Sequence, residues 1–207
     1  MSAADEALLI FVKAPRPGLV KTRLAVDLGA EAACAAYVRM VNVLCSRLSQ
    51  LPSVELHYSP ADAEVEIGLW LRPGWKAHPQ VEGDLGRRLR LAFAQCFKRG
   101  AQRAAVIGSD CPEITAADIL EAWQALASKD VVLGPATDGG YWLIGLNRDH
   151  PGLFENIDWS TPQVLAQTLL RAEQNGLTVH QLRALPDVDS LSDWQAFLAQ
   201  ERPGDQR

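Results

Sequence analysis

Short apolar runs alternate along this chain with longer segments of helical periodicity. The runs ALLIFVK (residues 7–13) and AAVIG (residues 104–108) are the clearest, and near-continuous apolarity indicates strands buried on both faces of a parallel sheet. Strands that alternate with helices predict an α/β fold with right-handed crossovers. Because ligands of such folds bind outside the carboxyl ends of the strands, the residues that follow each strand are candidate site residues.

The other elements are expected from periodicity, turn residues and caps. Further strands are predicted at residues 54–59, 75–79, 131–134, 141–146 and 178–182. Helices are predicted at residues 20–28, 30–50, 61–71, 85–99, 116–128, from Thr161–Pro162 to Gly176 and from Ser190 onward. These elements form one predicted domain over residues 1–207, with a core at about 7–195 and a frayed tail at 200–207.

The composition favours a small-molecule partner over a nucleic acid. The 207 residues carry a net charge of −5, whereas a general nucleic-acid surface needs clustered Lys and Arg. The four cysteines have neither zinc-ligand nor disulfide-framework spacing, which fits reduced thiols. No apolar run approaches the roughly 20 residues that span a bilayer, and acids precede the first apolar run where a signal peptide has basic residues. We therefore expect a cytoplasmic protein without a membrane span, whose oligomeric state the sequence leaves open.

The loop KAPRPGLVKTRLA (residues 13–25) is cationic in a chain that is acidic overall, and it turns at Gly18. Its four cations, with no acid among them, are Lys13, Arg16, Lys21 and Arg23. A local field of this sign suits phosphate, and backbone N–H groups at a strand-to-helix turn add to it. The loop is not a Walker A motif, because Ala14 and Val20 occupy the glycine positions of GxxxxGK[ST]. An exposed basic turn is the alternative.

Aspartates follow the later strands. Asp110 in GSDCP comes directly after the buried strand 104–108, where a metal ligand would lie, and a turn or helix-capping role is the alternative. Asp187 and Asp189 in LPDVDS follow the last strand, and alternation along an extended segment places both on one side. If Asp110 meets a late aspartate, their like charges need a cation between them. Mg²⁺ takes one or two carboxylates and completes its shell with water and phosphate, so these acids and the basic loop would form one nucleotide site.

Two glycine-containing segments supply further candidates. Asp138 in TDGGY precedes Gly139 and Gly140, which permit close approach of a ligand to the backbone, and a hairpin turn explains the pattern nearly as well. Asp84 in EGDLGRRLR stands before a predicted helix, where it either caps the helix or contacts a ligand. Arg88 of the same segment is a candidate for phosphate binding.

Six segments together resemble a known family. They are FVKAPRPGLVKTRLA, EGDLGRRL, VIGSDCPEIT, LGPATDGGYWLIGL, IDWST and DVDSLSDW. Over about residues 7–195 their order is similar to that in small bacterial GT-A-like transferases, the arsenosugar-biosynthesis and radical-SAM/selenodomain-associated glycosyltransferases of the nucleotide-diphospho-sugar transferase superfamily. Relatives of these proteins include 2-phospholactate guanylyltransferases and molybdenum-cofactor nucleotidyltransferases. The resemblance implies a Rossmann-like GT-A fold with a mixed, mostly parallel sheet flanked by helices.

The resemblance also implies roles for the candidate residues. The basic loop would handle the nucleotide phosphates, Asp110 with Asp189 or Asp187 would hold the metal, and residues 138–140 would line the sugar or acceptor pocket. Two departures matter. GSDCP has one Asp where many glycosyltransferases have DxD, which weakens the case for sugar transfer, and DVDSLSDW stands where relatives often have DVDTPEDL.

We therefore expect a transferase that depends on Mg²⁺ (or Mn²⁺) and uses a nucleotide-activated donor. Glycosyl transfer to a small acceptor is the preferred version, nucleotidyl transfer with pyrophosphate release is the alternative, and a non-catalytic nucleotide-binding module is a third possibility. The predicted nucleotide-binding residues are Lys13, Arg16, Gly18, Lys21, Arg23 and Arg88. The predicted catalytic residues are Asp110 and Asp138, the substrate-binding residues Gly139, Gly140 and Asp84, and the metal ligands Asp110, Asp189 and Asp187.

Overall fold

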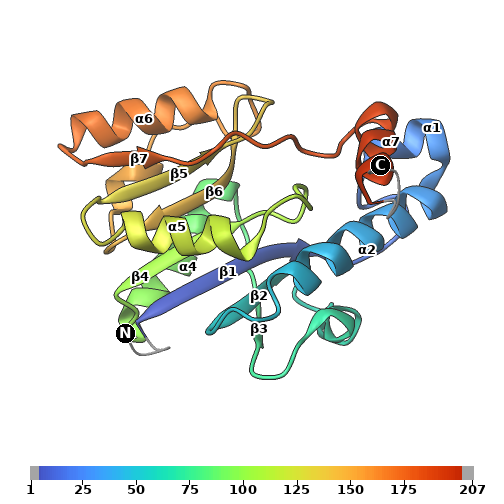
Figure 1. The fold of residues 1–207 in the computed structure, drawn as a ribbon, viewed down its shortest axis with the longest axis horizontal. Coiled ribbons are helices and arrows are strands. Elements are labelled where there is room, and N and C mark those ends of the chain that lie inside the picture. The colour runs from blue at the N-terminus through green and yellow to red at the C-terminus, as the bar shows by residue number, and fades with distance from the viewer. Residues whose placement is uncertain (1–4, 202–207) are drawn as a thin grey trace, which may run out of the picture.

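The computed structural model describes residues 5–201 and contains a seven-stranded sheet in the order β3-β2-β1-β4-β6-β5-β7 (Figure 1). The strands are β1 (Glu6–Lys13), β2 (Val54–Ser59), β3 (Lys76–Pro79), β4 (Arg103–Ile107), β5 (Val131–Pro135), β6 (Tyr141–Leu146) and β7 (Val179–Gln181). Neighbouring strands are parallel except where β6 pairs antiparallel with β4 and β5. This mixed, mostly parallel sheet flanked by helices confirms the predicted fold class.

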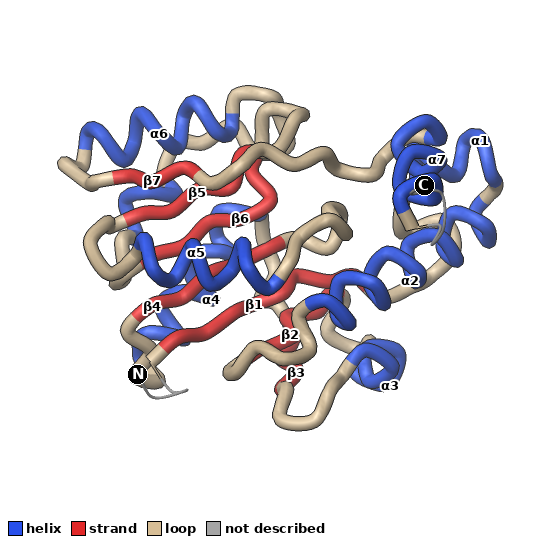
Figure 2. Tube along the Cα trace, viewed as in Figure 1, coloured by secondary structure: helices blue, strands red, loops and turns tan. Residues whose placement is uncertain are grey.

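Helices cover both faces of the sheet (Figure 2). They are α1 (Thr22–Leu28), α2 (Ala30–Arg47), α3 (Glu64–Ile67), α4 (Leu85–Lys98), α5 (Ala116–Ala125), α6 (Val164–Gln174) and α7 (Leu191–Gln200). Because successive strand residues point to opposite faces, β1 contributes to two cores. Leu8 and Ile10 pack with residues of α2 and α5, whereas Leu9 packs with residues of α4 and α6.

The last helix returns to the beginning of the chain. Figure 1 shows α7 beside α1 and α2, beyond the carboxyl ends of the parallel strands. Leu24 and Ala33 form a small buried cluster against which Trp194 packs, and Phe197 packs with Met40. This packing brings the segment that precedes α7 next to the loop that follows β1.

Most predicted elements are present, and several helices differ in extent. The helices predicted at residues 30–50 and 116–128 end earlier, at Arg47 and Ala125. The helix predicted at residues 61–71 is only Glu64–Ile67, continued by a 3-10 turn at Gly68–Trp70. The helix predicted from Thr161–Pro162 begins at Val164, because the Thr161 hydroxyl donates to the Asp158 carbonyl and closes a turn first. Capping boxes form as their spacing indicates, at Thr115 with Asp118 and at Ser190 with Asp193.

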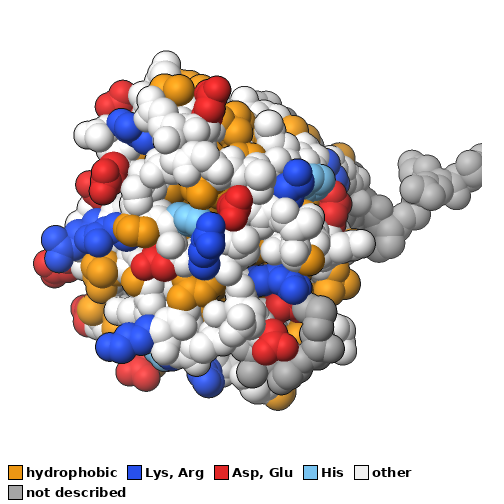
Figure 3. Space-filling model, turned by 90° about the vertical axis from the view of Figure 1, so that its left-hand side faces the viewer, with side chains coloured by type: hydrophobic (Ala, Val, Ile, Leu, Met, Phe, Trp, Pro, Cys, Tyr) orange, Lys and Arg blue, Asp and Glu red, His pale blue; other side chains and the backbone are white. Residues whose placement is uncertain are grey.

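The end of the molecule away from the carboxyl edge has a mixed surface. Figure 3 shows Lys and Arg side chains interspersed with Asp and Glu on this face. Among the residues described, no helix combines the length and apolarity needed to cross a membrane. Of the tail predicted at 200–207, Gln200 ends α7, and residues 202–207 lie outside the described part of the chain.

Candidate functional site

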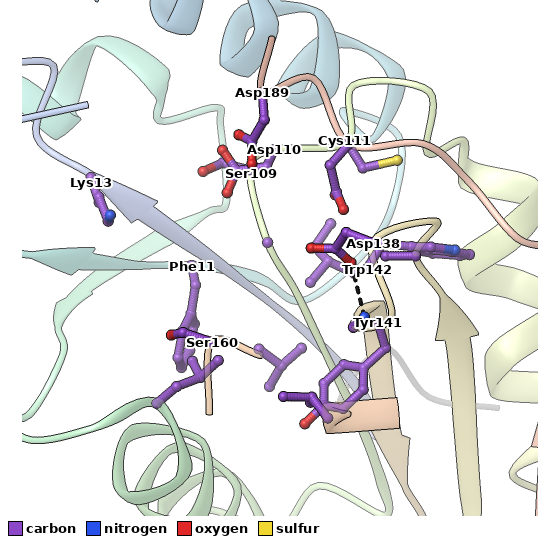
Figure 4. A pocket seen from close by; sticks show the side chains of 18 of the residues that line it. Phe11, Lys13, Ser109, Asp110, Cys111, Asp138, Tyr141, Trp142, Ser160 and Asp189 are labelled. Atoms are coloured by element: carbon purple, nitrogen blue, oxygen red, sulfur yellow. Dashed lines mark hydrogen bonds between the residues drawn. The ribbon is translucent and has the colours of Figure 1, made fainter. Parts of the chain in front are cut away.

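A cleft of about 640 Å³ opens at the carboxyl edge of the sheet (Figure 4). Its walls come from the ends of β1 and β4, the β5–β6 turn, the start of α4 and the segment before α7. The predicted site residues that line it are Lys13, Lys21, Arg23, Arg88, Asp110, Asp138, Gly140, Asp187 and Asp189. Cations from the first loop and acids from the middle and the end of the chain therefore meet in one place.

Lys21 is the centre of this arrangement. Its side chain is only 3% exposed, and its Nζ lies 2.5 Å from Asp110 Oδ1 and 2.9 Å from Asp189 Oδ1. The same Nζ donates to the Val188 carbonyl at 2.7 Å. Burial lowers the pKa of Lys21, but the two carboxylates outweigh burial and the net pKa is raised. Lys21 is therefore a permanently charged ammonium that joins two distant parts of the chain.

The backbone of Lys21 explains how its side chain reaches inward. Lys21 has φ 48° and ψ 47°, the left-handed conformation, directly before the first residue of α1. For a residue with a Cβ this conformation costs about 1–2 kcal/mol, and such strain persists where the surroundings hold it in place. The three contacts of the Lys21 ammonium hold the residue in this conformation.

Backbone pairing brings the acids together. Val188 N donates to the Asp110 carbonyl at 2.9 Å, which places the segment that carries Asp187 and Asp189 beside the loop that follows β4. Leu185 N donates to the Pro135 carbonyl at 3.1 Å and extends the sheet edge beside β5. Main-chain hydrogen bonds therefore position the segment DVDS, and the side-chain contact of Asp189 with Lys21 adds to them.

Asp187 is the most perturbed acid of the cleft. Burial raises its pKa, and the charges of Asp138, Asp110 and Asp189 raise it further, to about 7, against a smaller opposing effect of Lys21. A carboxyl group with this pKa exchanges protons near neutral pH. A cation that enters the cleft would favour the ionised form of Asp187 and lower this pKa.

The donor set suits a hard divalent cation completed by a substrate. Within residues 5–201 no three His, Cys, Asp or Glu side chains are already arranged around a metal position. Instead, the carboxylates of Asp110 and Asp189 converge on the Lys21 ammonium. Oxygen ligands from one or two carboxylates, with the remaining positions taken by water and phosphate, are what Mg²⁺ uses. The residues present therefore fit this ion.

The two glycines after Asp138 are each required for a different reason. Asp138 Oδ1 accepts from Gly140 N at 2.9 Å, which closes the turn, and Asp138 also lines the cleft. Gly139 has φ 90°, and a Cβ there would lie 2.2 Å from the Pro162 carbonyl oxygen. Gly140 lines the cleft, whereas Gly139 is needed for packing against the loop before α6.

Four predicted site residues lie outside the residues that line the cleft: Gly139, described above, and Arg16, Asp84 and Gly18. Arg16 is turned away, because its guanidinium binds Glu66 at 2.8 Å and Asp62 at 3.1 Å. Asp84 is the N-cap of α4 and accepts from the backbone N–H three residues on at 2.7 Å, so the capping alternative applies. Gly18, with φ 79°, serves the turn itself.

Sequence reasoning missed two polar groups that organise the cleft. The Tyr37 hydroxyl of α2 accepts from Lys13 N at 2.8 Å and lies 3.1 Å from Ser109 Oγ, so it ties the ends of β1 and β4 together. Both residues line the cleft. The available signal was a tyrosine on an otherwise apolar helix face, because a buried hydroxyl needs a partner.

In open α/β sheets ligands bind outside the carboxyl ends of the strands, which is where this chain places its cations and acids. The chain belongs to the family described as "Uncharacterized protein conserved in bacteria (DUF2064)", whose model matches residues 45–161. No curated protein matches the chain.

Solved structures share this fold, and one that is 32% identical is named as a transferase. A "putative nucleotide-diphospho-sugar transferase" from Desulfovibrio desulfuricans G20 is 32% identical, with a TM-score of 0.89, over 99% of this chain and 90% of that one. CMP:2-keto-3-deoxy-manno-octonic acid synthetase, complexed with CTP, has 15% identity and a TM-score of 0.60 over 96% of this chain and 100% of that one. A Mycobacterium tuberculosis H37Rv protein in complex with manganese has 15% identity and a TM-score of 0.58, covering 94% and 98%. The latter two likenesses concern the fold.

Proposed function

We propose that this protein is a Mg²⁺-dependent transferase that uses a nucleotide-activated donor and acts in the cleft at the carboxyl edge of the sheet. The single observation that carries the proposal is the contact of Lys21 with both Asp110 and Asp189. It joins the basic loop to the acids that would hold a metal. The transferase names of the structural neighbours support the enzyme class.

The residues of the cleft have different roles in this proposal. Asp110 and Asp189 would hold Mg²⁺, with Asp187 close enough to share its charge. The bound ion would supply positive charge to the oxygens of the donor phosphates. Lys13, Lys21 and Arg23 neutralise the negative charge that develops on the departing phosphate. Asp138, on the opposite wall, is the candidate base for the acceptor.

Glycosyl transfer is the version that we favour. The acceptor hydroxyl oxygen bonds to the anomeric carbon while the bond from that carbon to the donor diphosphate breaks. The electron pair leaves with the nucleoside diphosphate, and the hydroxyl proton passes to Asp138. The 32% identical structure, named for nucleotide-diphospho-sugar transfer, supports this version, as does the resemblance to arsenosugar-biosynthesis glycosyltransferases.

Nucleotidyl transfer is the second candidate, favoured by the single aspartate of GSDCP. Here a phosphate oxygen of the acceptor attacks the α-phosphorus of a nucleoside triphosphate and pyrophosphate leaves. The structural likeness to a synthetase that binds CTP supports this version at the level of the fold. The same cations and metal ligands serve both reactions, because both place charge on a departing phosphate.

Calorimetry with nucleoside diphosphates and triphosphates, with and without Mg²⁺, tests the proposal. We expect Asp110→Asn to lose the Mg²⁺-dependent part of the affinity, by about tenfold or more, while the variant remains folded with a melting temperature lowered by the loss of one of the two ion pairs of Lys21. Asp62→Asn is the matched control, because Asp62 is exposed and binds Arg16 outside the cleft. Full Mg²⁺-dependent affinity in Asp110→Asn would contradict the metal role, and turnover of nucleotide sugars against triphosphates separates the two versions.

A further inference from the structure

The cleft extends beyond its charged residues into an apolar chamber on the α4 side of the sheet. The residues that define the apolar chamber are Phe11, Leu85, Leu89, Val106, Ile144 and Val164. Phe11, Val106 and Ile144 come from β1, β4 and β6, and they belong to or pack against the core under α4. In Figure 4, Phe11 lies across the opening from Asp110 and Asp189. The core under α4 is therefore open to the cleft at this end.

Two polar side chains beside the apolar chamber, Gln80 and Thr161, are already bonded within the protein, whereas the buried hydroxyl of Tyr141, which lines the same cleft, has no hydrogen-bond partner among the described residues. Gln80 donates through Nε2 to the His57 carbonyl at 2.6 Å and accepts from Arg88 Nη1 at 3.1 Å. The Thr161 hydroxyl donates to the Asp158 carbonyl at 2.7 Å. A polyol or the hydrogen-bonding edge of a nucleobase needs several partners and would find only the Tyr141 hydroxyl available among these three side chains, and polar groups lose affinity when they are buried without partners.

The chamber therefore suits an uncharged, mainly hydrocarbon part of a ligand. Ligand sites combine a mainly apolar lining with a few polar groups that fix orientation, and here the two parts occupy different ends of one cleft. Water in an apolar chamber has few partners, so its replacement by an apolar group is favourable. The charged end takes the phosphates, and the chamber remains for a part of the ligand that carries no charge.

We propose, resting on the proposed function, that the acceptor is amphipathic: a small alcohol whose aliphatic or aromatic body lies in the apolar chamber. Its reacting hydroxyl then lies at the polar end of the body and faces the wall that carries Asp138. Phe11 and Ile144 form the floor of the chamber from the sheet, and Leu85 closes it from α4. The acceptor is thereby selected by its carbon body and the donor by its phosphates.

NMR titration of the wild-type chain with a series of 1-alkanols, from butanol to octanol, measures binding to the chamber without any nucleotide. Each methylene that enters the chamber is expected to tighten binding up to about fourfold, the factor that ~0.8 kcal/mol per buried CH₂ gives. Leu85→Glu places a charge at the chamber and is expected to abolish the dependence on chain length. Glutamate suits the first turn of α4, so the variant is expected to fold.

Leu170→Glu is the matched control, because it makes the same substitution at a half-exposed position of α6. It should keep the wild-type dependence on chain length. Binding that is independent of chain length, or a dependence that Leu85→Glu leaves intact, would overturn the proposal. Displacement of the alkanol by a nucleoside triphosphate with Mg²⁺, but not by pyrophosphate with Mg²⁺, would also overturn it, since the nucleobase would then occupy the chamber. Failure of the proposed function is read separately, as nucleotide affinity that Mg²⁺ does not change.

Discussion

Replacement of Lys21 by methionine is the sharpest test of the charge arrangement in the cleft. The substitution keeps most of the side-chain volume and removes the ammonium that Asp110 and Asp189 share. The carboxylates then face each other and Asp187 without that cation. We expect a folded but less stable protein at neutral pH, with part of the stability restored by Mg²⁺, which supplies the missing positive charge.

The expected loss follows from the distances and the exposures. At 2.5 and 2.9 Å each ion pair has a Coulomb energy of about 6 kcal/mol at an effective dielectric constant near 20, before the cost of burying the charges. Removal of one partner from a fully buried pair costs about 3–5 kcal/mol. Because Asp110 is 54% and Asp189 43% exposed, water recovers part of this cost, which leaves about 2–3 kcal/mol. For a chain of this size the melting temperature then falls by about 4–12 °C.

Thermal unfolding by circular dichroism, with and without Mg²⁺, measures this effect. Lys98→Met is the control, because Lys98 is exposed on α4 and lies away from the cleft lining. The reasoning is refuted if Lys21→Met without Mg²⁺ melts at the temperature of the control. It is also refuted if the loss is present but Mg²⁺ stabilises wild type and variant equally, because the vacated position would then not accept a cation.

Three further predictions concern the cleft and its surroundings. Burial and neighbouring carboxylates raise the pKa of Asp187 to about 7, so the folded state holds a proton that the unfolded state releases. The metal-free wild type should therefore lose stability as the pH rises from about 4 to about 7, and urea unfolding of Asp187→Asn should show a weaker decline. In the same assay, Gly139→Ala should lower the free energy of unfolding by more than about 2 kcal/mol, because the added Cβ would lie 2.2 Å from the Pro162 carbonyl oxygen. Gly18→Ala should lower it by only about 1 kcal/mol, because a Cβ there meets no atom and only the φ of 79° is unfavourable. Arg16→Met should leave the Mg²⁺-dependent nucleotide affinity, measured by calorimetry, unchanged. A marked loss of affinity would show that Arg16 contributes to the nucleotide site.

Local features of the chain were readable from the sequence. The run ALLIFVK is β1 almost residue for residue, and Val54–Ser59 is β2 as predicted. The capping box at Thr115 forms because its two hydrogen bonds join residues three apart. Such features depend on neighbours along the chain, so periodicity and cap chemistry identify them without a structure.

The composition of the site was partly readable for a related reason. The rule that ligands bind at the carboxyl ends of strands selects Lys21, Asp110 and Asp189 from their positions after predicted strands, and all three meet in the cleft. The rule places a residue at an edge, but it does not say which way the side chain turns. Asp84 also follows a strand, yet it caps α4 instead of facing the cleft.

The sequence by itself determined the order of strands and helices, the caps, and the set of charged residues at one edge of the sheet. Only the tertiary structure decided which of them act together: Lys21 and Arg16 are equivalent in the sequence of the loop, but Lys21 meets an aspartate 168 positions away and Arg16 a glutamate 50 positions away. The apolar chamber likewise exists only where three strands and α4 face one another. Contacts of this range depend on how the sheet and helices pack, and no periodicity along the chain encodes them.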